Sequence, residues 1–280
     1  MKRFMKSIMP AAAWQALSRI RSHYIYYRYQ RNIKYYPRRV VRHKYGDDEF
    51  QILIADPSGE SWYDRDWQKL PEITLLSTSR LRSGATVFNI GAHQGLIALM
   101  LARAVSPSGK VVAVDPHPVN IELIRENAIL NEQHMIQTIQ AAVGEVSGTA
   151  HFGGHLNDRL AISSDDMSIG MAVRVVCMDD LCNEHGNPDV VFLDVEGFEW
   201  SVLQGARRLI EVGHTDWFVE VHVNTGLEAF GKSAAEVLAF FPDDRFNLFV
   251  ASESLRDFVK KEDHPDLQLD RFFLVAIPKN

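Results

Sequence analysis

The sequence predicts an α/β protein whose core is a doubly wound, mostly parallel sheet, and three observations support this. From residue 84 onward, apolar runs of strand length alternate with amphipathic stretches of helix length. The strand-length runs are apolar at consecutive positions, which is typical of strands that helices cover on both faces. In addition, a glycine-containing turn leads from the first of these runs directly into a helical stretch, as in many ligand-binding α/β sheets.

The first 46 residues differ from the rest of the chain in charge. They hold 12 of the 30 lysines and arginines and no acidic residue, whereas residues 47–280 hold the other 18 and all 36 acids, a formal charge of −18. Seven of the eight tyrosines lie between Tyr24 and Tyr45, interleaved with arginines. Apolar and tyrosine side chains recur every three or four positions over residues 11–36, which predicts a helix. Residues 1–46 are therefore expected to form a basic, tyrosine-rich helical arm.

The sequence leaves the role of this arm open. Its apolar helical face suits packing against the acidic body or against a second copy in a homodimer, and its tyrosines and arginines suit a membrane surface. A nucleic acid is the least favoured partner, because the net negative charge of the body repels a polyanion. The interrupted apolar stretch at the start is a poor secretory signal, and no apolar run has the roughly 18 residues of a spanning helix. The expected location is the cytoplasm, with peripheral contact at the inner membrane surface as an alternative.

Residues 47–83 are expected to form an extension that precedes the main domain. Its expected elements are a hairpin of residues 50–55 and 59–63 and a helix through residues 76–81. The extension also contains Trp62 and Trp67. These two side chains either anchor the hairpin to the core, which is the favoured interpretation, or fold over a binding site and contact a substrate.

Residues 84–280 are expected to form one domain of alternating strands and helices. The expected strands are residues 85–90, 110–115, 136–143, 173–177, 189–194, 217–222, 246–251 and 272–277. The expected helices are residues 96–105, 119–131, 200–210 and 234–241. The last two strands leave no room for a convincing helical crossover, which parallel neighbours require, so an antiparallel strand is expected at the edge of the sheet.

Composition excludes several classes of protein. With 46% hydrophobic and 24% charged residues, the chain can bury a core, which excludes a wholly disordered protein. The two cysteines, Cys177 and Cys182, are too few for a disulfide framework or a structural zinc site and are expected to stay reduced.

Ligands of an open α/β sheet bind at the carboxyl ends of its strands, so the residues that follow each strand are the candidates. After the first strand, Gly91 would let the backbone approach a ligand, and Gly95 would let the helix begin close to the sheet. This Gly-x-x-x-Gly turn is not the Gly-x-Gly-x-x-Gly of a dinucleotide site. The second strand ends at Asp115, where a carboxylate is placed to accept both hydroxyls of a ribose. Together these residues indicate an adenosine-type cofactor.

The acidic candidates lie at the carboxyl ends of the strands expected over residues 189–194 and 217–222. Asp194 and Glu196 crowd one turn, which structural needs alone rarely produce because neighbouring carboxylates repel each other and desolvate badly. Glu199 follows them and also fits the first turn of a helix, which favours negative charge. Glu220 and His222 alternate with valines and therefore share one face of the strand expected over residues 217–222.

These four segments together resemble the FkbM family of S-adenosylmethionine-dependent methyltransferases. The glycine turn is similar to the family motif D-x-G-A-N-x-G, with Asn89 where an acid is usual and His93-Gln94 in place of Asn-x. The other matches are residues 115–120 to E-P-x-P-x-N, residues 194–199 and 202–206 to D-x-E-G-x-E with V-L-x-G-A, and residues 220–222 to E-x-H. The resemblance covers residues 84–225 in the family's order.

The resemblance implies a Rossmann-like, seven-stranded class I methyltransferase domain over residues 84–280. It also implies methyl transfer from S-adenosylmethionine to a hydroxyl of a small molecule or glycan, such as a sugar or a polyketide-type acceptor. Carried over by position, the 91–95 turn would hold the methionine end of the cofactor, Asp115 the ribose, and the strand end at residues 141–142 the adenine. The implied cofactor-binding residues are Asn89, Gly91, Ala92, His93, Gly95, Asp115, Pro116, Ala142 and Asp194.

Methyl transfer to a hydroxyl requires that the hydroxyl proton leaves, so a general base or a metal is expected. The candidate base is His222, and the candidates for orienting it or binding substrate are Asp194, Glu196 and Glu220. The same set of oxygen and imidazole groups also suits a divalent cation such as Mg²⁺, which is the less favoured interpretation. No residue is assigned as a metal ligand on this basis.

Two other classes of function remain as alternatives. An NAD(P)-dependent oxidoreductase shares the strand, glycine turn and acid, but the chain lacks Gly-x-Gly-x-x-Gly and any plausible Tyr-x-x-x-Lys pair. A methyltransferase-like fold could also serve as a membrane-binding or nucleic-acid-binding protein through its basic arm.

Overall fold

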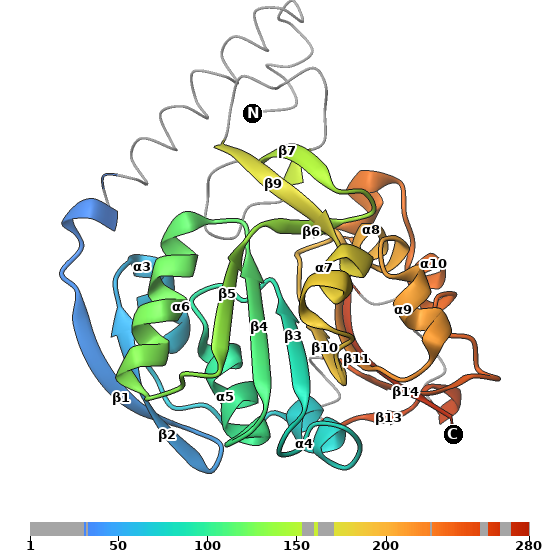
Figure 1. The fold of residues 1–280 in the computed structure, drawn as a ribbon, viewed down its shortest axis with the longest axis horizontal. Helices are drawn as coiled ribbons and strands as arrows, with labels where there is room; N and C mark the ends of the chain where they lie inside the picture. The colour runs from blue at the N-terminus through green and yellow to red at the C-terminus, as the bar shows by residue number, and fades with distance from the viewer. Residues whose placement is uncertain are drawn as a thin grey trace, which may run out of the picture.

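The computed structural model describes residue 31 and residues 33–152, 160–161, 171–224, 226–252, 257–263 and 270–279. The helix expected over residues 11–36 falls almost wholly outside these ranges, as does most of the arm over residues 1–46. The central sheet has eight strands in the order β13-β12-β14-β11-β10-β3-β4-β5 (Figure 1). Its strands are β3 (Thr86–Ile90), β4 (Lys110–Asp115), β5 (Ile136–Gln140), β10 (Val190–Leu193), β11 (Asp216–His222), β12 (Phe246–Ala251), β13 (Val259–Lys260) and β14 (Arg271–Pro278).

The predicted α/β fold with a mostly parallel sheet is confirmed, but the sheet has eight strands and not seven, because the two-residue strand β13 adds an edge. Strands β5, β4, β3, β10 and β11 run parallel, whereas β14 runs antiparallel to both of its neighbours, β11 and β12. The predicted antiparallel edge is present, since the edge strand β13 also pairs antiparallel with its neighbour β12. Of the two strands expected to form this edge, β14 lies further inside the sheet, where residues 272–276 are apolar at consecutive positions and all except Phe273 are fully buried, which suits a strand covered on both faces.

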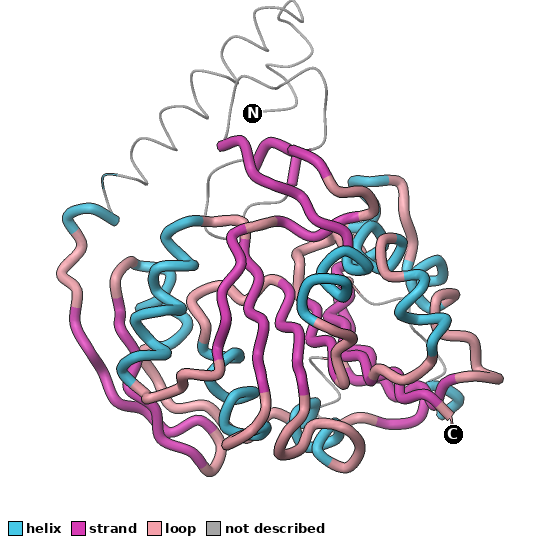
Figure 2. Tube along the Cα trace, viewed as in Figure 1, coloured by secondary structure: helices cyan, strands magenta, loops and turns pink. Residues whose placement is uncertain are grey.

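Alternating side chains of the central strands build two cores, one on each face of the sheet. Val87, Ala113 and Phe192 belong to the core that contains α5 (Leu96–Val105) and α6 (Pro118–Leu130). Their neighbours Phe88, Val112 and Leu193 belong to the opposite core. The helices there are α7 (Met178–His185), α8 (Glu199–Gln204), α9 (Arg207–Val212) and α10 (Ala234–Leu238), and Figure 2 shows these helices grouped apart from α5 and α6. The single helix expected over residues 200–210 is thus two helices, separated by residues 205–206.

The extension before the main domain differs from its prediction. Strand β1 (Arg39–Tyr45) pairs with β2 (Asp48–Ile54), so the hairpin includes residues that the sequence assigned to the helical arm. Consequently the expected boundary between residues 46 and 47 falls in the turn of a hairpin. The expected second strand, residues 59–63, is part of helix α3 (Pro57–Tyr63), because Pro57 occupies its first turn and Asp56 caps it by accepting a hydrogen bond from the Gly59 N–H at 2.8 Å.

Polar side chains of α6 fix the hairpin to the main domain. The backbone N–H of Leu53 donates to Asn127 Oδ1 at 2.8 Å, and that of Gln51 donates to Asn131 Oδ1 at 2.9 Å. After the hairpin, α3 and α4 (Pro71–Ser77) carry the chain to β3. The helix expected through residues 76–81 thus begins earlier, at Pro71.

A second, four-stranded sheet lies beyond the carboxyl ends of β4 and β5 (Figure 1). It consists of β6 (Ala142–Gly144), β9 (Met171–Cys177), β7 (Gly148–Phe152) and β8 (Leu160–Ala161), in that order. The single strand expected over residues 136–143 is therefore split: β5 pairs with β4, and β6 pairs with β9. Among the helices that the structure describes, none is long and apolar enough to cross a membrane.

Candidate active site

A cavity of about 350 Å³ lies at the carboxyl ends of β3, β4, β10 and β11. The extension and β14 complete its wall, because Tyr63, Glu72 and Arg271 also line it. Seven of the nine residues implied to bind the cofactor line the cavity: Gly91, Ala92, His93, Asp115, Pro116, Ala142 and Asp194. The other two, Asn89 and Gly95, are not among its lining residues. Asn89 is 2% exposed within β3, and a Cβ at Gly95 would lie 3.1 Å from Ile124 of α6, so Gly95 allows α5 to pack closely.

Gly91, directly after β3, lies against the backbone of Asp194, directly after β10. Its φ of +81° is in the left-handed region, and a Cβ at this position would lie 1.7 Å from the carbonyl oxygen of Asp194. The N–H groups of Gly91 and Ala92 both donate to the carbonyl of Val114, at 2.9 and 3.0 Å. The turn is therefore held between β10 and β4, and no residue with a side chain fits at Gly91.

Asp115 presents a rigid carboxylate at the end of β4. Its Oδ1 accepts hydrogen bonds from the His117 N–H at 2.8 Å and from Asn120 Nδ2 at 3.0 Å, and its Oδ2 accepts one from the His93 N–H at 2.9 Å. Burial nevertheless raises the pKa of Asp115 to about 7, against the effect of these three donors. Hydroxyl donors from a ribose would further stabilise its ionised form.

His93 and Tyr63 form a hydrogen-bonded pair between the glycine turn and helix α3. Nδ1 of His93 is bonded to the Tyr63 hydroxyl. Burial lowers the pKa of His93 to about 4 and raises that of Tyr63, so the ring is neutral and the phenol is the donor. The proton of the imidazole is then on Nε2, which is buried and has no hydrogen-bond partner among the described residues.

These features fit S-adenosylmethionine. Asp115 offers acceptors for ribose hydroxyls, Gly91 lets the backbone approach the ligand closely, and the unpartnered donor of His93 can pair with an acceptor at the methionine end. Ala142 lines the same cavity beside them. The residue assignments themselves stay predictions.

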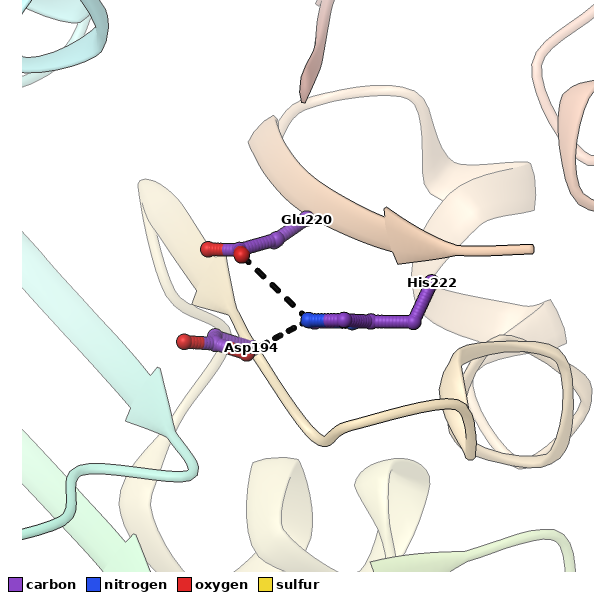
Figure 3. A group of neighbouring side chains, drawn as sticks. All are labelled: Asp194, Glu220 and His222. Atoms are coloured by element: carbon purple, nitrogen blue, oxygen red, sulfur yellow. Dashed lines mark ion pairs between the residues drawn. The ribbon is translucent and has the colours of Figure 1, made fainter. Parts of the chain in front are cut away.

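All four predicted catalytic residues meet around the ring of His222 (Figure 3 shows three of them). His222 Nε2 lies 3.3 Å from Glu220 Oε1, 3.5 Å from Glu196 Oε2 and 4.0 Å from Asp194 Oδ1. On the other edge of the ring, Nδ1 is 2.9 Å from Glu199 Oε1. In Figure 3 the nitrogen edge of the ring points between the carboxylates of Glu220 and Asp194. His222 is 3% exposed and stands behind the carboxylates that line the cavity.

The charges of this cluster alter its proton affinities. Burial alone would lower the pKa of His222, but its hydrogen bond to Glu199 and the nearby carboxylates raise it to about 10. The pKa of Asp194 is raised by burial and by the charge of Glu220. A ring that is protonated at neutral pH cannot accept a proton, so His222 can act as a base only if another cation takes the place of that proton. Its role as a base stays a prediction.

Glu199 is a site residue whose role the sequence suggested only weakly. The sequence favours a position in the first turn of a helix, and Glu199 does begin α8. Its side chain, however, is fully buried. Its Oε1 accepts a hydrogen bond from the Gly197 N–H at 2.8 Å and also bonds to Nδ1 of His222. Its place as the last acid of the D-x-E-G-x-E motif was the available signal.

Other wall residues come from distant parts of the chain and had no motif to mark them. Arg271 of β14 has its Nε 3.2 Å from Glu220 Oε1. Burial raises the pKa of Glu72, in the first turn of α4, to about 7. Trp62 and Trp67 both line the cavity, and Trp67 also packs against Tyr45, with ring centroids 5.8 Å apart. The two interpretations of these tryptophans are therefore compatible.

Comparison with known families gives a match to the one described as the methyltransferase FkbM domain, over residues 89–248, which is more than half of the chain. A relative from Sulfolobus acidocaldarius named "Probable cobalt-precorrin-6B C(15)-methyltransferase (decarboxylating)" is 26% identical over 157 residues, which cover 56% of this chain and 76% of that protein.

Solved structures of methyltransferases are also similar. The FkbM methyltransferase of Methylobacillus flagellatus KT matches 69% of this chain with 17% identity and a TM-score of 0.45, but the match covers only 43% of that chain. A SAM-dependent O-methyltransferase of Thermotoga maritima matches 86% of this chain and 77% of its own, with 12% identity and a TM-score of 0.43.

Proposed function

Because the chain belongs to the FkbM family of S-adenosylmethionine-dependent methyltransferases, we propose that it methylates a hydroxyl oxygen of a small molecule or glycan, of the sugar or polyketide type. The carboxylate cluster around His222, beside the glycine turn, is the observation that carries this proposal. Family membership supports a methyltransferase over the oxidoreductase alternative. Cytoplasmic location and a docking role for residues 1–46 stay predictions from the sequence.

The cofactor would bind along the glycine turn and Asp115. When bound, S-adenosylmethionine supplies an electrophilic methyl group on a positively charged sulfur. Gly91 abuts the backbone of Asp194, so the turn that would hold the methionine end adjoins the first residue of the carboxylate cluster. An acceptor oxygen placed by this cluster is thus near the position where the methyl group is expected, as an in-line reaction requires.

The charge of the cavity favours a neutral acceptor rich in hydroxyl groups. Glu72, Glu196 and Glu220 line it in addition to Asp115 and Asp194. Among the lining residues in the described part of the chain, only Arg271 carries a permanent positive charge. Carboxylates accept hydrogen bonds from hydroxyls and repel anionic groups, so a polyanion such as RNA is disfavoured.

The aromatic residues of the wall suit the apolar faces of a sugar ring or macrocycle. Trp62 is 45% exposed and lines the cavity, together with Trp67, Phe218 and Phe273. Flat aromatic side chains give apolar contact area, while a few polar groups fix orientation, which is the usual division of roles in small-molecule sites.

The test is methyl transfer by the full chain with S-adenosylmethionine labelled with ¹³C in its methyl group. We would supply methyl glycosides, a hydroxylated macrolide and an unmodified RNA, and locate the label by two-dimensional NMR. We expect a labelled methyl on oxygen of a neutral acceptor and none on RNA. Label on nitrogen or carbon, or on RNA alone, would contradict the proposal.

The variant Gly91→Val serves as the control for contaminating activity. Its added side chain would collide with the Asp194 carbonyl, so no product is expected from it. Product formed equally by this variant would show that the activity comes from another protein in the preparation.

A further inference from the structure

We propose that Asp194, Glu220 and His222 form a binding site for a six-coordinate divalent cation, Mg²⁺ or Mn²⁺, beside the acceptor position. Each side chain offers one ligand atom, a carboxylate oxygen or the imidazole Nε2, and the three atoms lie within 4.8 Å of one another (Figure 3). Adjacent ligands of an octahedral ion at about 2.1 Å lie about 3.0 Å apart. The distances of 3.3 and 4.0 Å from His222 Nε2 to Glu220 and Asp194 therefore require only a small closure.

The environment of His222 points independently to a ligand. Its Nε2 is buried within the cluster yet makes no hydrogen bond with any described residue, and the same holds for Asp194 Oδ1. Its Nδ1 is held by Glu199 at 2.9 Å, and Glu199 is fully buried. A metal-binding histidine typically donates its other ring N–H to a carboxylate in this way, which fixes the tautomer that leaves Nε2 free to bind.

The charges in this region leave room for a dication. Asp194, Glu196 and Glu220 gather within 4.0 Å of one ring nitrogen, and the guanidinium of Arg271 lies 3.2 Å from Glu220. Glu199 adds a fourth carboxylate at the other edge of the ring, so four carboxylates face two cationic groups, the guanidinium and the protonated ring of His222. A divalent cation that displaces the proton of the ring would offset the remaining negative charge.

The donor set selects the class of ion. Two carboxylates and one imidazole are mostly hard oxygen ligands, and no thiolate is present in the three-residue set, so Mg²⁺ and Mn²⁺ fit better than soft metals. Three protein ligands leave coordination positions for water and for an oxygen of the acceptor.

The role of the cation, which rests on the proposed function, is to make the acceptor hydroxyl more acidic. A cation beside that oxygen lowers the pKa of the hydroxyl. The O–H bond then breaks with its proton passing to Glu196, whose Oε2 is 3.5 Å from His222 Nε2. The oxygen forms a bond to the methyl carbon, and the electron pair of the broken carbon–sulfur bond stays on sulfur.

The test measures Mn²⁺ binding to the EDTA-treated full chain, without cofactor or acceptor. The readout is the electron paramagnetic resonance signal of free Mn²⁺, which decreases as the ion binds. We expect one site per chain, with competition by Mg²⁺. Asp194→Asn and Glu220→Gln should each weaken binding at least tenfold. Glu72→Gln, which removes a carboxylate from the same cavity but outside the three ligands, should leave the affinity unchanged.

Thermal melting and binding of S-adenosylhomocysteine by each variant report whether it is folded. Absence of a Mn²⁺ site in the wild-type chain, or equal affinities in all three variants, overturns the proposal. If oxygen methylation proceeds at full rate in EDTA, the proposed catalytic role of the cation is overturned, whereas the proposed function is not. Conversely, if the chain binds Mn²⁺ at this site but methylates no oxygen, the cation site is supported and the proposed function is overturned.

Discussion

The two halves of the cavity differ in how well hydrogen bonds satisfy their charged side chains. In the half formed by β3 and β4, the Asp115 carboxylate already accepts three hydrogen bonds, and backbone groups fix the turn at Gly91. In the half formed by β10 and β11, His222 Nε2 and Asp194 Oδ1 are buried without a hydrogen-bond partner among the residues that the structure describes. The first half is organised before its ligand arrives, whereas the second gathers charges that need a further group to balance them.

The substitution Gly91→Val should break both halves at once and have the largest effect. A side chain here collides with the Asp194 carbonyl, so either the glycine turn or the β10 exit must move. We expect binding of S-adenosylhomocysteine to fall more than 100-fold by calorimetry, and stability to fall by about 1–3 kcal/mol or more. The matched control is Gly186→Val, at a residue with a similar φ of +83° but open space around it. Similar loss of affinity in both variants would contradict the steric explanation.

The substitution Asp115→Asn should damage the cofactor half alone. It removes the charge that would accept ribose hydroxyls and loses the acceptor of the His117 N–H or the His93 N–H. Since hydrogen bonds to charged groups contribute about 1.5–3 kcal/mol, we expect a loss of roughly 10- to 100-fold in affinity for S-adenosylhomocysteine. Mn²⁺ affinity should not change. If it fell in parallel, the two halves would not be separable.

The pH dependence of cofactor binding should follow the ionisation of Asp115. Burial raises its pKa to about 7 in the free protein, and ribose hydroxyls bind the ionised form, so affinity should rise as the pH increases through 7. Between pH 8 and pH 6 we expect a decrease of about tenfold, since a carboxyl with this pKa must lose a proton to bind. Calorimetry in two buffers of different ionisation enthalpy would detect the released proton. An equally steep dependence in Asp115→Asn would assign the effect to another group.

The smallest expected effect is that of Tyr63→Phe. It removes the donor to His93 Nδ1, so the ring loses the contact that keeps its proton on Nε2. We expect a decrease of about three- to tenfold in affinity for S-adenosylhomocysteine, the size of one neutral hydrogen bond. The matched control is Tyr45→Phe, because the Tyr45 hydroxyl donates to the Tyr63 carbonyl at 2.5 Å and Tyr45 does not line the cavity. A larger loss in the control would indicate that packing of the extension, and not the His93 tautomer, controls binding.

The sequence could predict the sheet and most of the strand exits because their signals are local. Helix Leu96–Val105 and strand Lys110–Asp115 have the bounds that their apolar patterns predict. Carboxyl ends of neighbouring parallel strands share one edge, so the meeting of Asp194 with Glu220 also followed from topology, since β10 and β11 pair.

The features that the sequence did not predict depend on local capping or on contacts between residues far apart in the chain. Residues 59–63 read as a strand, yet the cap at Asp56 and the proline at position 57 make them helical. Glu72 and Arg271 reach the cavity only because α4 and β14 pack beside it, and neither lies in a recognisable motif. The burial of Glu199 likewise depends on tertiary packing, which a helix-start signal does not reveal.

The amide side chains that hold β2 against α6 have a consequence for how this protein can change. Asn127 and Asn131 hydrogen-bond to β2, and buried apolar side chains of the extension pack against α5, so the extension is attached to helices and not to the central sheet. It nevertheless supplies Trp62, Tyr63 and Glu72 to the cavity wall. Part of the wall on the acceptor side therefore comes from a stretch of chain outside the central sheet, and Tyr63, through its bond to His93, is its link to the cofactor turn. Replacing residues 39–77 with the counterpart from a relative, while keeping Tyr63 and the two asparagines, offers a route to new acceptors that leaves the strands of the methyltransferase domain unchanged.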